Sequence, residues 1–303
     1  MNKRQQGFSL IELMVVLLIF MIVSAVIFGL INVAQIRYRS EQQFLDSFKS
    51  ARDAVDLMVR DIRNAGYPPP FTYAGNLNFP PNGPTPVLYP APVPWTDPAA
   101  AGQTLQNRFS AGIVGFNAGL LRDMTCTVNG GANLCRIPNA WDMVLELDVD
   151  PENNLAGAPP TVELVRYNLC WADPNGPCTP VTGVPAFGNM PPWLVRSIST
   201  KNMVANPTGS LAGIVPPLTS NSALVEVIVQ NPALAPNAVL PDGSRNIPMF
   251  QFICAGGAAF CTVEQIDSVI VTVRTRGANQ DVQTRRFRGV TVHGMARRLN
   301  PSR

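Results

Sequence analysis

The amino-acid sequence predicts an α+β fold in which one long N-terminal helix packs on an antiparallel β-sheet. No proline occurs in residues 1–67, where apolar residues recur with helical spacing. The second half of the chain holds several short segments rich in β-branched residues. A helical run followed by a run of strands is typical of α+β domains. The net charge of +3 and the absence of a dense basic block give no surface for a nucleic acid.

The first element is an apolar segment that can cross a membrane. Residues 1–7 are short and basic, and residues 8–36 contain Glu12 as their one charged residue. The uninterrupted part, residues 13–31, is 19 residues long, about the length that spans a hydrocarbon core. Because the basic residues precede the apolar ones, the positive-inside bias places the N-terminus in the cytoplasm and the rest of the chain outside it.

Glu12 needs a physical reason, because a carboxylate inside a membrane helix is costly. Insertion scales give about 2.5 to 3.5 kcal/mol for an aspartate at the centre and less near an end. If the chain is cut between Gly7 and Phe8, a new α-amino group appears on Phe8 at the same membrane depth. The Glu12 carboxylate of a neighbouring subunit is a natural partner for it, since pairing offsets two desolvation penalties. Glu12 is therefore the candidate residue for a contact between subunits.

The heptapeptide that starts at Gly7, Gly-Phe-Ser-Leu-Ile-Glu-Leu, resembles the class III signal of type IV prepilins and type II secretion pseudopilins. The resemblance implies that residues 1–7 are a leader peptide, that a prepilin peptidase cleaves after Gly7, and that Phe8 becomes N-methylated. It also implies a pilin-like fold and filament assembly that depends on Glu12. The implied partners are other minor and major pilins through the transmembrane helix of residues 8–36, the prepilin peptidase, and inner-membrane lipid.

Residues 37–66 are expected to continue the helix beyond the membrane as an amphipathic stalk. Gly66 is the expected C-cap, since a proline follows at position 68. We expect the apolar stripe to pack on a sheet of the same chain rather than in a coiled coil, because fewer than three heptads are present. The stripe recurs at spacings of three and four and consists of Phe44, Phe48, Ala51, Val55, Met58 and Ile62.

Residues 67–98 hold eleven of the 29 prolines, interleaved with aromatic residues. Such a segment forms neither a regular helix nor a central strand. Two interpretations stay open. The segment is either a loop that covers the head with its aromatic side chains as anchors, or a proline-rich peptide that binds a partner.

Residues 99–303 are expected to form a β-rich periplasmic head. In residues 271–276, Val271, Val273 and Thr275 alternate with Thr272, Arg274 and Arg276 as in a one-faced antiparallel strand. The gap at residues 277–281 suits a hairpin turn. The strand-like segments are residues 142–149, 161–169, 224–229, 268–274 and 282–292.

Six cysteines form three pairs that are close in the sequence: Cys126 with Cys135, Cys170 with Cys178, and Cys254 with Cys261. Three local disulfides are the simplest pairing, although sequence alone does not fix the connectivity. Such disulfides require an oxidising compartment such as the periplasm. A zinc site is disfavoured because no pair has the C-x2-C spacing and the chain has a single histidine, His293.

We expect no enzymatic activity, no metal and no cofactor. No spacing typical of a nucleophile elbow, a zinc protease or a phosphate-binding loop occurs, and His293 is expected to be structural. Residues 148–154 carry oxygen ligands at alternating positions, beginning with Asp148 and Asp150. Pro151 and a missing glycine break the EF-hand pattern. An acidic turn is favoured there, with calcium as the open alternative.

The motif DIRNAGY at residues 61–67 and the arginine-bearing hairpin around residues 285–287 resemble the PilW-type minor pilins and, more distantly, the J-type minor pseudopilins. The resemblance implies a minor pilin that initiates or tips a type IV pilus and primes its assembly, with the type II secretion pseudopilus as the alternative. A large tip adhesin is a further partner left open. A pilin-anchored adhesin or periplasmic binding protein is the second alternative. The expected location is the inner membrane, then the pilus at the cell surface.

Overall fold

The computed structural model describes residues 9–66, 110, 112–117, 123–149, 162–170, 192–200, 220–225, 229–231, 234–240, 243–280 and 287–298. The chain divides into two compact units, each of which is described by itself. The first is Met1–Asp46 with Gly277–Arg288, and the second, called the head below, is Ser47–Arg276 with Gly289–Arg303. The proline-rich residues 67–98 lie outside the described residues.

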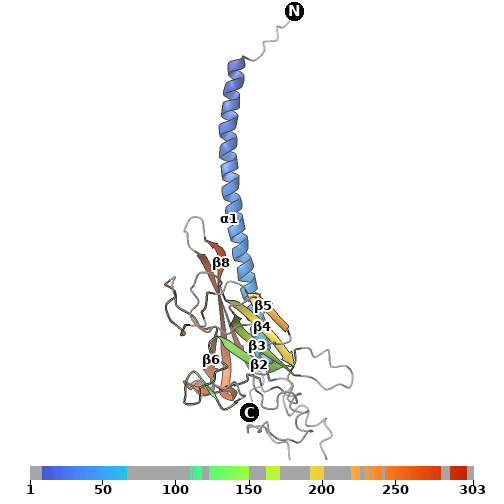
Figure 1. Ribbon diagram of the computed structural model, residues 1–303, viewed down its shortest axis with the longest axis vertical. Helices are drawn as coiled ribbons and strands as arrows, with labels where there is room; N and C mark the ends of the chain where they lie inside the picture. Colours follow the sequence, from blue (N-terminus) through green and yellow to red (C-terminus); the bar gives the residue numbers. More distant parts are fainter. Residues whose placement is uncertain are drawn as a thin grey trace, which may run out of the picture. The chain divides into compact units, whose positions relative to one another are not determined.

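Helix α1, Leu10–Asn64, runs through 55 residues (Figure 1). A proline-free sequence permits this length, and Arg63 in the last turn complements the negative end of the helix dipole. The chain leaves the helix at Gly66, whose φ of 92° is the left-handed conformation of a C-terminal cap. The single helix ending near residue 64 and the glycine cap agree with the sequence prediction.

The apolar stripe of α1 is buried from Ala51 onwards. Ala51, Val55, Met58 and Ile62 are all buried in the head, whereas Phe48 is 40% exposed. The last four turns of the helix therefore supply one side of the hydrophobic core, and the stripe is fully buried only from Ala51, about two turns after its predicted start at Phe44.

Four antiparallel strands in the order β2-β3-β4-β5 form the larger sheet of the head, coloured green to orange in Figure 1. On its β2 edge, residues 112–114 add a short extension, because Val114 N donates to Val144 O at 3.0 Å and Glu146 N donates to Gly112 O at 2.7 Å. The strands are β2 (Asp142–Leu147), β3 (Glu163–Cys170), β4 (Trp193–Thr200) and β5 (Ser220–Val225).

A second sheet has the order β6-β8-β9. Its strands are β6 (Phe250–Cys254), β8 (Ile266–Gln280) and β9 (Phe287–Arg297). A two-stranded sheet pairs β1 (Thr127–Val128) with β7 (Cys261–Thr262). The short 3-10 helices η3 (Ala255–Gly257) and η4 (Val263–Gln265) lie on either side of β7.

The core of the head joins α1 to both larger sheets. One cluster of buried residues contains the helix stripe, Leu145 and Val165 of the four-stranded sheet, and Val271 of the three-stranded sheet. A smaller cluster covers the opposite face of β2 and β3 and consists of Val114, Phe116, Ile137, Val144 and Leu164. Since β2 and β3 are covered on both faces, they carry consecutive apolar residues, Met143–Leu145 and Leu164–Val165, and this interrupts the simple alternation of a one-faced strand.

The predicted segments 142–149, 161–169, 268–274 and 282–292 correspond to strands β2, β3, β8 and β9. The predicted turn at 277–281 is wrong, because β8 continues to Gln280 and β9 begins at Phe287. Pairing along a β-ladder overrides the local preference of a glycine. The predicted segment 224–229 is also misplaced: β5 ends at Val225, and Val229 lies outside any strand, with its amide bonded to Arg274 O at 2.9 Å. Strands β4 and β6 were not predicted.

Candidate functional site

The N-terminus of α1 places the Glu12 carboxylate next to the start of the helix. Ser9 O accepts the amide of Leu13 at 3.2 Å, and Glu12 Oε2 accepts the amide of Ser9 at 3.2 Å. The Glu12 contact is half of a capping box, which satisfies an amide that the helix itself leaves without a partner. Gly7 and Phe8 lie outside the described residues, so cleavage and methylation there stay predictions.

The first half of α1 exposes an apolar surface. Nearly all side chains of residues 10–36 are exposed, among them Phe20, Phe28 and a long series of Leu, Ile and Val. Within the described part of the chain, α1 is the one helix that is long and apolar enough to cross a membrane. A continuous apolar surface of this extent marks a region that meets a membrane or another protein.

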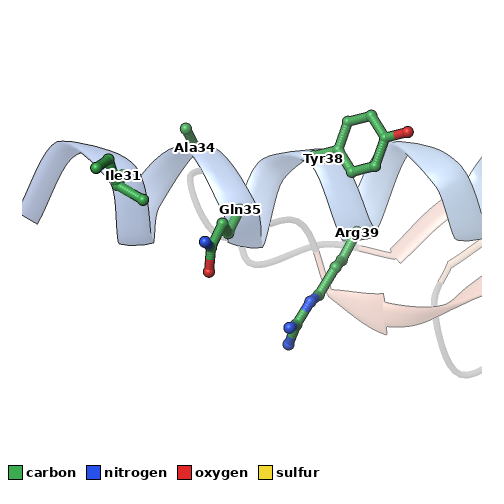
Figure 2. Close-up of a pocket in the computed structure, with 5 residues that line it drawn as sticks. All are labelled: Ile31, Ala34, Gln35, Tyr38 and Arg39. Atoms are coloured by element: carbon green, nitrogen blue, oxygen red, sulfur yellow. The ribbon is translucent and has the colours of Figure 1, made fainter. Parts of the chain in front are cut away.

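A shallow hollow follows on α1, where the apolar segment gives way to charged residues (Figure 2). It is lined by Ile31, Ala34, Gln35, Tyr38 and Arg39. Their spacing of three and four residues places them on neighbouring turns, and Figure 2 shows Gln35 and Arg39 pointing to the same side of the helix. An aromatic residue beside arginines at the end of an apolar span is typical of a membrane interface.

In the head, a buried carboxylate fastens α1 to the four-stranded sheet. Asp61 Oδ2 accepts hydrogen bonds from Arg196 Nε at 3.1 Å and Arg196 Nη2 at 3.0 Å, and also from the Tyr167 hydroxyl. Tyr167 on β3 and Arg196 on β4 are directly opposite each other in the antiparallel register. The pairing of the two strands therefore brings both donors to the same helix turn.

The electrostatics of this cluster keep the Tyr167 hydroxyl protonated and the Arg196 guanidinium charged. Asp61 is only 3% exposed. Burial, and then the nearby Asp61 carboxylate, raises the pKa of Tyr167, so its hydroxyl remains a donor. Burial alone would lower the pKa of Arg196, but Tyr167 and Asp61 outweigh it and raise the pKa above the ordinary value. The guanidinium therefore stays charged against the carboxylate.

The C-terminal end of α1 is tied to strand β2 through Ser110. Gly66 N donates to Ser110 Oγ at 2.9 Å and Gly112 N donates to the same oxygen at 3.2 Å. The Ser110 hydroxyl in turn donates to Glu146 O. This buried serine links the residue that follows the helix, the extension of the sheet and β2 at one point.

Strand β9 approaches the other side of α1 at Gly294. A Cβ atom at this position would lie 2.6 Å from Val55 Cγ1 and 2.8 Å from Val59 Cγ2. Both distances are shorter than van der Waals contact, so glycine is required where helix and strand touch. The helix is thus held by β3 and β4 on one side and by β9 on another.

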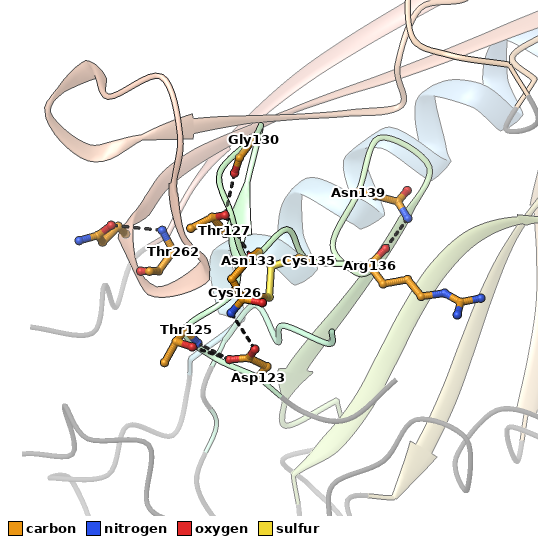
Figure 3. The surroundings of a disulfide bond; sticks show 11 residues. Asp123, Thr125, Cys126, Thr127, Gly130, Asn133, Cys135, Arg136, Asn139 and Thr262 are labelled. Carbon is orange, nitrogen blue, oxygen red and sulfur yellow. Dashed lines mark hydrogen bonds between the residues drawn. A yellow bond between two sulfur atoms is a disulfide. The ribbon is translucent and has the colours of Figure 1, made fainter. Parts of the chain in front are cut away.

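The structure forms two of the three predicted disulfides. Cys126 bonds to Cys135 (Figure 3), and Cys254 bonds to Cys261. The pairing of β1 with β7 joins the two disulfide-bonded loops, since Val128 is opposite Cys261 and Thr127 is opposite Thr262. The third predicted pair lies outside the described residues, which include neither the Cys170 side chain nor Cys178.

Asp123 organises the chain just before the first of these loops (Figure 3). Its carboxylate accepts Asn133 Nδ2 at 3.0 Å, Thr125 N at 2.9 Å and Thr125 Oγ1 at 2.7 Å. Burial would raise the pKa of Asp123, but these hydrogen bonds outweigh it and lower the pKa below its ordinary value. The result is a local turn with an ionised carboxylate at its centre.

The remaining sequence candidates give no reactive arrangement among the residues with described positions. His293 Nδ1 lies 3.0 Å from Thr272 Oγ1 on the adjacent strand, so this histidine has a structural partner. Within the same ranges no group of three His, Cys, Asp or Glu side chains is placed to hold a metal ion. Asp148 is described, but Asp150 and the rest of the predicted calcium-like run are outside the described residues.

Sequence reasoning missed the residues that fasten the helix: Tyr167, Arg196, Ser110 and Gly294. One signal was present. Asp61 lies between Met58 and Ile62 of the apolar stripe, three residues after the first and one before the second, and therefore near the buried face. A carboxylate in that position requires a buried cation or several donors. Its donors come from distant strands, and their register is not encoded locally.

Helix α1 exposes apolar side chains in its first half and enters the core of a β-rich head with its second half. This arrangement suits a protein that is anchored by its own N-terminal helix, and it is consistent with a pilin-like fold. Residues 2–28 match the prokaryotic N-terminal methylation motif. The motif is a type IV prepilin-like signal; it indicates the type IV pilin and pseudopilin family and implies contact with other pilins and processing by a prepilin peptidase. No curated protein and no solved structure matches the chain.

Proposed function

We propose that this chain is a minor pilin that initiates or tips a type IV pilus and primes its assembly. The observation that carries the proposal is the difference between the two halves of α1. Its first half bears the methylation motif and exposes its apolar surface, while Ala51 to Ile62 form part of the core of the head. The same helix therefore carries both the segment proposed for filament assembly and part of the core of the head.

Glu12 is the proposed assembly residue. In the single chain its carboxylate reaches back to the Ser9 amide, next to the position where cleavage after Gly7 would leave the α-amino group of Phe8. Exchange of this weak capping contact for a neighbour's α-amino group would add a charge pair in a medium of low dielectric constant. The gain is available only when subunits meet at the correct axial stagger.

The DIRNAGY motif supports the minor pilin assignment through the fold of the head. Asp61 fastens the helix to β3 and β4, Ile62 is in the core, and Gly66 caps the helix. The motif thus accounts for how a long helix is joined to this kind of head. The initiating or tip position within the filament, a large tip adhesin as partner, and roles in adhesion and motility are part of the proposal.

The test compares Glu12→Ala and Glu12→Gln with the wild-type chain in cells that form the pilus. The matched control is Glu41→Ala, an exposed carboxylate further along the same helix. We expect all four chains to fractionate with the inner membrane, and both Glu12 variants to lose most of the piliation and of the chain recovered in sheared filaments. The control should behave as wild type.

Normal pilus numbers in both Glu12 variants would overturn the proposal. Co-purification with a secretion channel rather than with pilus proteins would instead assign the chain to a type II secretion pseudopilus. An N-terminus at residue 1 or 2 in the mature protein, found by mass spectrometry, would indicate a membrane-anchored adhesin or periplasmic binding protein. We expect the mature chain to begin with methylated Phe8.

A further inference from the structure

The two disulfide-bonded loops, residues 126–135 and 254–261, project from one end of a shared two-stranded ladder. β1 and β7 are antiparallel and Val128 is opposite Cys261. In an antiparallel pair the end of one strand lies beside the start of the other. The residues that follow Val128 and those that precede Cys261 therefore emerge together, and the loops form one structural element.

Several contacts besides the chain connectivity hold this element in place. Besides the two disulfides, Thr127 Oγ1 donates to Gly130 O at 2.6 Å, and Asn129 Nδ2 donates across to Phe252 O of β6 at 2.8 Å. A capping box between Thr262 and Gln265 fixes the chain just after β7. All four cysteines are buried in the core cluster of the head. The loops are therefore presented on a rigid base.

The exposed part of this rigid element is uncharged, and its largest exposed side chains are apolar, beside the exposed polar residues Asn129 and Asn133. Neither residues 126–135 nor residues 254–261 contain a charged side chain. Phe260 is 55% exposed and Leu134 is 57% exposed, and residues 255–259, of the sequence AGGAA, are exposed beside Phe260. A disulfide one residue away holds Phe260 at the surface although the core lies close by. Large aromatic groups displayed in this way are typical anchors of protein interfaces.

We propose that the disulfide-bonded loops are a docking surface for an uncharged, apolar surface on a neighbouring protein subunit of the filament, with Phe260 as the anchor. This inference rests on the proposed pilin function. A partner with strong charge would lose hydration on these loops without gaining a counter-charge from them, since the nearby Asp123 and Arg136 lie outside the loops and Asp123 is already bonded to Asn133 and Thr125. A lipid-binding surface would normally carry Lys, Arg, Trp or Tyr, and the loops carry none. Because the loops are already ordered, docking costs little conformational entropy.

The test is hydroxyl-radical footprinting of the full-length chain in intact cells and after extraction and separation in detergent. We expect Phe260 and Leu134 to be oxidised several-fold more slowly in the cellular assembly than in the separated chain. Val239, which is 67% exposed elsewhere on the head, is the control and should react equally in both. Phe260→Asp should lower recovery in sheared filaments about tenfold or more, with both disulfides and the melting temperature retained, whereas Val239→Asp should not.

The outcomes separate this inference from the pilin proposal. Recovery of the wild-type chain in filaments with Phe260 equally reactive in both states would overturn the docking surface alone. Protection of Phe260 in a chain that never enters filaments would retain a protein interface and overturn the pilus role. Protection of the separated chain by phosphatidylethanolamine and phosphatidylglycerol vesicles would show a lipid surface and overturn the docking proposal. If the wild-type chain shows neither protection of Phe260 in cells nor recovery in sheared filaments, both the docking surface and the pilin proposal are overturned.

Discussion

Substitution of Asp61 by Asn tests whether the buried cluster joins α1 to the sheet. The amide has the shape of the carboxylate but no charge, so the Arg196 guanidinium would remain buried without its counter-ion. Both side chains are largely covered, with 4% of Asp61 and 11% of Arg196 exposed. Removal of one partner from a buried ion pair costs about 3 to 5 kcal/mol. Since the amide oxygen can still accept one hydrogen bond, we expect a loss near the lower limit.

A loss of about 3 kcal/mol corresponds to a fall of about 6 to 12 °C in Tm for a domain of this size. The assay is thermal unfolding of the full-length chain in detergent micelles, followed by near-ultraviolet circular dichroism. The matched control on the same helix is Asp56→Asn, because Asp56 is exposed and meets Arg52 only at 3.8 Å. An exposed pair of this kind contributes about 0.5 kcal/mol or less, so the control should change Tm by at most 1 to 2 °C, roughly.

A double substitution provides the sharper criterion. If the cost of Asp61→Asn arises from an uncompensated charge, then Asp61→Asn combined with Arg196→Gln should be more stable than Asp61→Asn alone. A double variant that is less stable than the single one, or an Asp61→Asn change no larger than the Asp56 control, would refute the electrostatic argument. The helix would then be held by apolar packing and by the Gly66–Ser110 contact.

Two further predictions concern the same contacts. Because the folded-state pKa of Tyr167 is raised above the usual value of about 10, the folded head keeps a proton that the unfolded chain loses. The free energy of unfolding should therefore be maintained below about pH 10 and fall above it by up to about 1.4 kcal/mol per pH unit. In urea titrations, Tyr167→Phe should remove this slope, and an unchanged slope would contradict the assignment. Gly294→Ala should destabilise the head by about 1 to 3 kcal/mol through overpacking against Val55. Gly289→Ala on the same strand is the control and should cost far less, because its Cβ would meet only Thr275 O at 3.4 Å. Equal losses of stability in the two variants would contradict the packing argument.

The α+β class and the long helix could be predicted because both depend on local patterns. The absence of proline in residues 1–67 and the spacing of Ala51, Val55, Met58 and Ile62 are properties of neighbouring residues. The cap at Gly66 follows from the preference of glycine for positive φ, which the structure shows. The pairing of Cys126 with Cys135 and of Cys254 with Cys261 is likewise a short-range choice.

The contacts that assemble the head could not be predicted, because they depend on register between distant strands. Arg196 joins Tyr167 at Asp61 only because β3 pairs with β4 in the observed register. Strand β8 extends past Gly277 to Gln280, although a glycine close to three polar residues indicated a turn. The joining of the two disulfide loops by β1 and β7 involves only two residues from each strand, too few for a periodic signal.

Ser110 has a consequence for how this domain can vary in length. Gly66 and Ser110 are joined by a hydrogen bond of 2.9 Å, so the chain leaves the helix and rejoins the sheet at one point. The end-to-end separation of residues 67–109 is thereby fixed whatever their number, and each doubling of a flexible loop costs only about 0.6 kcal/mol. Sequence could therefore be inserted or deleted here without a change in strand register. This junction is the natural site for attaching a foreign peptide to the head.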